Sequence, residues 1–80
     1  MKIMQITLDD DQMPTQIVAE LSLDEAVVLA KMTGKYSSLA AGEEFGDRAE
    51  CTTSVYDALT GGVFNRFWDD GVNEAARSPR

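Results

Sequence analysis

Carboxylates are the most numerous side chains in this sequence that could take part in chemistry. There are 14 Asp and Glu residues against 7 Lys and Arg, which gives a net charge of −7 in 80 residues. A hydrolytic pair of carboxylates needs a cleft in which burial raises the pKa of one of them. A chain this short can hardly supply such a cleft as well as a core, so we expect the carboxylates of the 43–50 segment to be solvated. They are Glu43, Glu44, Asp47 and Glu50.

The aspartate run at positions 9–11 is the candidate for a hard-cation site. Calcium-binding loops need a glycine at the turn and a closing glutamate about 12 residues along. Proline, at position 14, stands where the loop needs its glycine, and Glu20 lies in a segment with a strand pattern, so the calcium-loop pattern fails. We expect an exposed acidic turn here, with no metal and no cofactor.

Nucleophilic and phosphate-binding motifs are incomplete. No histidine is present to activate Cys51, the only cysteine, and a zinc site needs several Cys or His ligands. Gly34-Lys35 lacks the glycine that a phosphate-binding loop has five residues earlier, because Leu29 stands there. These absences lead us to expect a protein that is not an enzyme.

Three of the six aromatic residues fall in the run Val63–Trp68. A small domain needs its aromatic residues in the core. With one face exposed, the same residues could anchor a partner, because interface hot spots favour Trp, Tyr and Arg. The two roles can coexist. The predicted partner-binding residues are Phe64, Arg66, Phe67 and Trp68, together with Glu43, Glu44 and Asp47.

Two alternating segments open the chain. Residues 2–8 and 15–21 have the period of half-buried strands, and a turn-forming segment joins them, which predicts an N-terminal β-hairpin. Alternation places Ile3 on one face of the first strand. The apolar residues expected on the opposite face are Met4, Ile6 and Leu8.

A helix follows the hairpin. Ser22 and Glu25 have the spacing of a capping box, in which each side chain bonds the backbone N–H of the other residue. The helix is expected to run to Thr33 and to stop at Gly34, a residue that suits a left-handed C-cap.

The rest of the chain is less regular. Residues 35–50 have no clean period and predict a long loop, and a short helix is expected over 55–59. Over 63–68 a third strand is favoured, because glycine and aspartate pairs bound a six-residue run. A helix is the alternative, because Val63/Phe67 and Phe64/Trp68 are four residues apart. The sequence thus predicts one α+β domain over residues 1–70, with a hairpin, two helices and a third strand, and a flexible tail over 71–80.

Compartment and assembly follow from length and cysteine content. No apolar run is long enough for a signal peptide or a membrane span, and one unpaired cysteine suits a reducing compartment, so we expect a cytoplasmic protein without membrane contact. Small cores supply only about 3–5 kcal/mol of net stability, so self-association into a homo-oligomer is expected.

Part of the chain resembles a known group of proteins. A strand or hairpin, the helix from Leu23 to Thr33-Gly34, and the later segment Ser54–Leu59 are similar to small accessory proteins of actinobacterial phages. The resemblance implies a non-essential protein made inside an infected cell, and it supplies no catalytic residues.

The leading functional hypothesis is a small, acidic, non-enzymatic accessory protein of the phage type that binds and modulates a host protein. Direct nucleic-acid binding is excluded by the sign of the charge. One alternative is a nucleic-acid mimic that inhibits a host nuclease or defence system, because residues 9–25 include six acidic side chains and neither Lys nor Arg. Another is an oligomer that sequesters a small signalling nucleotide through Lys35, Arg48 and Arg66 converging across subunits.

Overall fold

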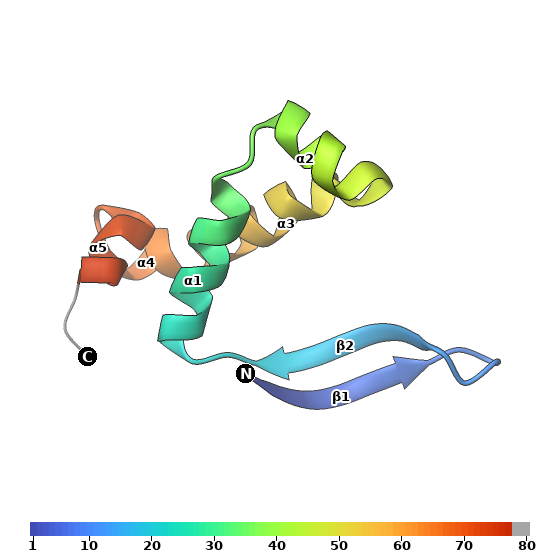
Figure 1. Cartoon of the computed structure of the whole chain (residues 1–80). Coiled ribbons are helices and arrows are strands. Elements are labelled where there is room, and N and C mark those ends of the chain that lie inside the picture. The colour runs from blue at the N-terminus through green and yellow to red at the C-terminus, as the bar shows by residue number, and fades with distance from the viewer. Residues whose placement is uncertain (78–80) are drawn as a thin grey trace.

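The computed structural model of the protein describes residues 1–77, in which a β-hairpin precedes a group of short helices (Figure 1). The antiparallel strands are β1 (Lys2–Leu8) and β2 (Pro14–Glu20). The helices are α1 (Leu23–Gly34), α2 (Ser38–Phe45), α3 (Glu50–Leu59), α4 (Asn65–Phe67) and α5 (Gly71–Arg77), with a 3-10 turn η1 (Gly46–Arg48) and a π-helical segment η2 (Thr60–Phe64). The predicted α+β class with an N-terminal hairpin is confirmed.

A bulge makes the hairpin amphipathic. The register shifts between Ile3 and Gln5, which leaves Met4 as an extra residue in β1. The flanking pairs are Ile3–Ala19 and Ile6–Ile17. Directly opposed residues share a face, and residues two apart in a strand share a face, so Ile3 lies on the same face as Ile6. The prediction that separated Ile3 from Ile6 is wrong because it assumed unbroken alternation.

The start of α1 is fixed by the predicted capping box. The Ser22 Oγ accepts a hydrogen bond from the Glu25 N–H at 3.1 Å, and the Glu25 Oε1 accepts one from the Ser22 N–H at 2.9 Å. The second carboxylate oxygen of Glu25 pairs with the terminal ammonium of Met1. One side chain therefore joins the start of β1 to the start of α1.

The core lies among the helices, centred on one aromatic ring. Its buried members are Ala26, Ala30, Phe64, Val72 and Ala75. Among residues 1–77, Phe64 is the only large side chain that is fully buried. Half-buried apolar residues surround this cluster, and they are Leu23, Val27, Tyr56, Leu59, Val63 and Trp68. All of them lie in the helical part or in the residue that follows α4, so within the described chain the hairpin contributes nothing to the core.

The predicted third strand over Val63–Trp68 is wrong, because this segment is helical. Gly61-Gly62 does not end the preceding helix, and the chain continues through η2 into α4. The Trp68 N–H donates to the Phe64 carbonyl at 3.0 Å, which places both rings on one side of the segment. Helical spacing, the alternative that the sequence offered, describes this run.

Residues 35–50 are not the long loop that the sequence predicts. The Ser37 Oγ accepts from the Ala40 N–H at 3.1 Å and caps α2, and Gly46, with φ +59°, follows its last turn. Only Ala41 of α2 is buried, which explains why this helix shows no apolar period. The next helix, α3, begins at Glu50, five residues before the predicted start.

The C-terminal segment of the described chain is ordered as a helix. The prediction of a flexible tail over 71–80 is wrong for residues 71–77, because α5 buries Val72 and Ala75 in the core. Lys31 donates to the Asn73 side chain at 3.2 Å, which links α1 to α5. Residues 78–80 lie outside the described part of the chain.

Gly34 acts by its small size and not by a left-handed conformation. It is the last residue of α1, and positive φ among the described glycines occurs at Gly46 and Gly71. A Cβ at Gly34 would lie 2.5 Å from the Tyr56 ring of α3. The absent side chain therefore lets α1 and α3 approach each other.

We predict opposite effects of alanine at two helical glycines. Gly34→Ala should lower the free energy of unfolding by about 1–3 kcal/mol, because the Tyr56 ring must shift. Gly42→Ala in α2 is the control, with open space around its Cβ. It should raise stability by about 0.5–1 kcal/mol through helix propensity. Chemical unfolding measures both, and a stabilising Gly34→Ala would contradict this account of the contact.

A second prediction concerns acid. The terminal ammonium, and then the Ser22 N–H, lower the pKa of Glu25 from 4.5 to about 2. A lowered folded-state pKa adds stability above the unfolded pKa, and that stability is lost as the pH falls through the folded value. Wild type should therefore be more stable than Glu25→Gln at neutral pH, and the difference should shrink between pH 4.5 and about 2. Denaturant unfolding of both proteins at several pH values measures this difference in the free energy of unfolding. A difference that does not change with pH would contradict the ion pair.

Candidate binding surface

The aromatic run is divided between the core and the surface. Phe64 is fully buried and cannot meet a partner, which corrects its place among the predicted binding residues. Phe67, three residues later, is 69% exposed. Trp68 is half-buried, with its ring centroid 6.1 Å from that of Phe64 and 6.4 Å from that of Phe67. Trp68 thus connects the buried ring to the exposed one.

Arg66 and Phe67 form the exposed part of this run. The Arg66 guanidinium carbon lies 5.6 Å from the centroid of the Phe67 ring, in the range of a cation–π contact. At an exposed site such a contact is worth about 0.5–1 kcal/mol, enough to favour one arrangement of the two side chains. We call Arg66, Phe67 and Trp68 the aromatic patch.

The acidic part of the predicted site lies elsewhere. Glu43 and Glu44 are exposed on α2, and Asp47 is exposed in η1. Figure 1 shows α2 and α4 at different ends of the helical group, so the structure does not bring these carboxylates to the aromatic patch. The fold therefore separates two sets of residues that were predicted from the sequence to form one site.

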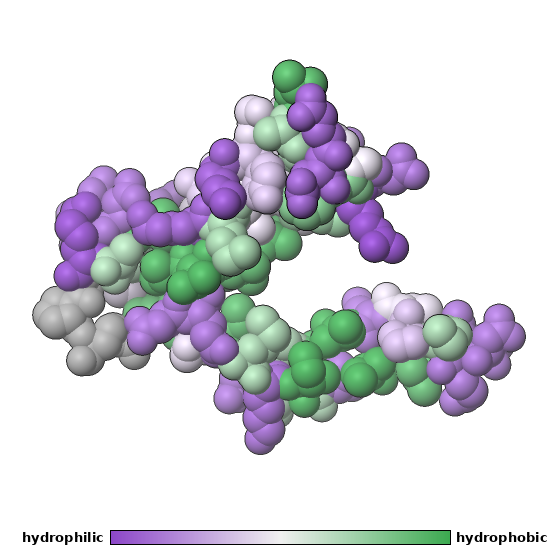
Figure 2. Space-filling model, viewed as in Figure 1, coloured by the Kyte–Doolittle hydropathy of each residue, from purple (hydrophilic) through white to green (hydrophobic). Residues whose placement is uncertain are grey.

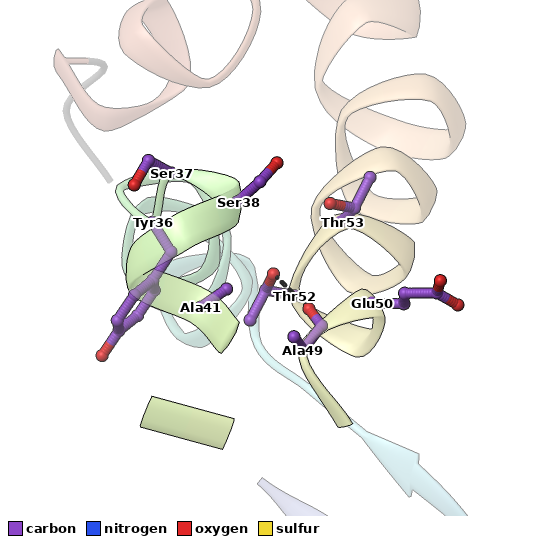
Figure 3. A pocket seen from close by; sticks show the side chains of 8 residues that line it. All are labelled: Tyr36, Ser37, Ser38, Ala41, Ala49, Glu50, Thr52 and Thr53. Atoms are coloured by element: carbon purple, nitrogen blue, oxygen red, sulfur yellow. Dashed lines mark hydrogen bonds between the residues drawn. The ribbon is translucent and has the colours of Figure 1, made fainter. Parts of the chain in front are cut away.

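A hollow of about 290 Å³ lies between α2 and α3. Its lining residues are Tyr36, Ser37, Ser38, Ala41, Ala49, Glu50, Thr52 and Thr53. Two of the lining hydroxyl groups already bond the backbone. The Ser37 Oγ accepts from the Ala40 N–H as the cap of α2, and the Thr52 Oγ1 donates to the Ala49 carbonyl at 2.8 Å. Figure 3 shows the Glu50 carboxylate directed away from the space between the helices. The lining therefore offers no nucleophile beside a base.

The acidic turn of the hairpin is organised by its own backbone. The Asp9 Oδ1 accepts from the N–H groups of Asp11 and Met13, at 2.9 and 3.0 Å. Gln12 takes a positive φ of 65° in the same turn. Among residues 1–77, no group of three or more His, Cys, Asp or Glu side chains could hold a metal ion. In the same part of the chain, no helix is both long and apolar enough to cross a membrane.

Exposed apolar residues also occur outside the aromatic run, and they were not predicted from the sequence. On α1, Val28 and Met32 are 57% and 55% exposed, and they are four residues apart. Several apolar residues of the hairpin are also about half exposed. The sequence signal that could have revealed them is the number of apolar residues in α1, which is larger than its core-facing side needs.

No protein-family model, curated protein or solved structure matches this chain. The resemblance to phage accessory proteins stays a prediction.

Two phenylalanines of the run should respond differently to truncation. Phe64→Ala should lower the free energy of unfolding by about 3–5 kcal/mol, because it empties the centre of the core. Phe67→Ala should change it by about 1 kcal/mol or less, because its ring is exposed and its contact with Arg66 is worth no more than that. Thermal and denaturant unfolding of both variants measure the difference, and similar costs would contradict the division of the run.

Proposed function

We propose that this protein is a non-enzymatic accessory protein that binds and modulates a protein of the cell in which it is made. The observation that supports this most is the exposed Phe67 ring, which lies beside the Arg66 guanidinium and in contact with the Trp68 ring. The resemblance to phage accessory proteins extends the proposal to a host protein in an infected cell. The single, exposed Cys51 fits the reducing cytoplasm as the place of action.

The aromatic patch has the composition and the support of an interface hot spot. Hot spots are enriched in Trp, Tyr and Arg, and they bind best where little side-chain freedom is lost on association. Trp68 is packed against the core cluster, and Phe67 and Arg66 constrain each other. A matching partner would present an apolar pocket for the Phe67 ring and a carboxylate for the Arg66 guanidinium.

Variants at the patch test this proposal by affinity capture from host lysate. Phe67→Ala and Arg66→Ala should each reduce recovery of a specific partner by about tenfold or more. Leu39→Ala is the matched control, because Leu39 is 74% exposed on α2, away from the patch. Equal recovery by folded Phe67→Ala and by wild type would contradict the proposal.

A triple variant separates the proposal from the nucleic-acid mimic. Asp10→Asn, Asp11→Asn and Glu20→Gln together remove three of the six acidic charges of residues 9–25, and they should leave recovery unchanged if the aromatic patch binds the partner. A mimic would instead lose binding in this variant, and its binding should fall steeply with salt. Such a result would favour that alternative.

A further inference from the structure

The hairpin stands apart from the helical group with one apolar face uncovered. This apolar hairpin face comprises Ile3, Ile6, Leu8, Ile17 and Ala19. The exposed fractions of Ile3, Ile6 and Ile17 are 50%, 51% and 60%. Figure 2 shows hydrophobic side chains gathered along the hairpin, with open space between it and the helices. An isolated two-stranded hairpin is marginally stable at best in water, so this face requires a cover.

A second apolar surface lies along α1. A groove of about 360 Å³ is lined by Met1, Asp24, Glu25, Val28, Leu29 and Met32. We call it the α1 groove. Val28 lies two residues from both Ala26 and Ala30, which are in the core, so helical geometry turns it to the opposite side of α1. The groove and the core therefore occupy opposite sides of one helix.

The surface of the chain is too large for a compact monomer. Its accessible area is 6191 Å², whereas a folded monomer of this mass exposes about 4,700 Å². Its radius of gyration is 14.6 Å, against about 12 Å for a compact domain of this length. The excess area of about 1,500 Å² is more than the roughly 800 Å² that each partner buries in a standard stable interface.

A second copy of the chain is the occupant that these observations favour. The need for a cover is permanent, and a second copy is present wherever the chain is made. Each chain has both an apolar hairpin face and an α1 groove. In a dimer with a two-fold axis, the hairpin face of each protomer can therefore cover the groove of the other, so that both surfaces are buried in both protomers. A core with one large buried side chain is also the kind that oligomerisation commonly supports.

We propose that two copies form a symmetric dimer in which the hairpin of each protomer lays its apolar face against the α1 groove of its partner. Neither surface includes the aromatic patch, so the dimer stands independently of the proposed function. The three aspartates lie in the turn between the strands, beyond the apolar face, so they do not enter the contact. Because both protomers are acidic, added salt should strengthen the dimer by screening their repulsion.

Sedimentation of the full chain over a range of concentrations tests the proposal. Wild type should sediment as a dimer, and Ile6→Lys should raise its dissociation constant by about a hundredfold, because each dimer would then bury two ammonium groups in apolar surface. Val18→Lys is the matched control, since Val18 pairs with Gln5 on the other hairpin face and is 48% exposed. It should leave the dimer intact. A monomeric wild type, or equal weakening by both lysines, would overturn the proposal.

Complementation tests the reciprocal geometry even if the single variants lose hairpin structure. Val28→Glu places a carboxylate in the α1 groove and should also weaken the homodimer. In a mixture of Ile6→Lys and Val28→Glu chains, one contact of each heterodimer is wild type and the other joins opposite charges. Dimers should therefore return on mixing, with circular dichroism of the hairpin restored. Failure to recover dimers would exclude the reciprocal arrangement.

Discussion

The helical part of this protein depends on the burial of Phe64 within one small cluster. Its neighbours in that cluster are Ala26 and Ala30 from α1, and Val72 and Ala75 from α5. Alanines leave room for one large ring but fill little space themselves, so the single side chain of Phe64 connects α1 to α5, which are distant in the sequence. The same constraint places Trp68 one helical turn further on, and Trp68 supports the exposed Phe67. The aromatic patch thus takes its position from the core contact.

The hairpin obeys a different constraint. Its turn and its register are local, since Asp9 bonds the backbone of the turn and cross-strand pairs align the strands. Its apolar face gains no burial from the helices of its own chain. The molecule therefore combines a helical part whose core surrounds the Phe64 ring with a folded hairpin whose apolar face is exposed. The large exposed area follows from this combination.

The elements that could be predicted from the sequence are those with a local signal. The capping box at Ser22 and Glu25 and the two alternating segments predicted α1 and the hairpin. The bulge at Met4 depends on cross-strand pairing, and α2 buries only Ala41, so neither left a periodic pattern to read. For Val63–Trp68, flanking glycines suggested a strand, whereas the π-helical turn admits Gly61-Gly62 within a continuous helical path. The packing of the helices decides that Phe64 is buried and that Phe67 is exposed. It also sets the distance of the acidic residues from both rings.

α5 lies C-terminal to every other described element, yet it supplies two of the buried core residues. Synthesis from the N-terminus therefore releases the hairpin and α1 well before Phe64 can be covered. During that interval the nascent chain presents the apolar residues of the hairpin and has no closed core. Neighbouring ribosomes on one message hold several such chains close together. In the proposed dimer, docking of one chain's hairpin on the α1 groove of another could then precede closure of either core, so that assembly would guide folding.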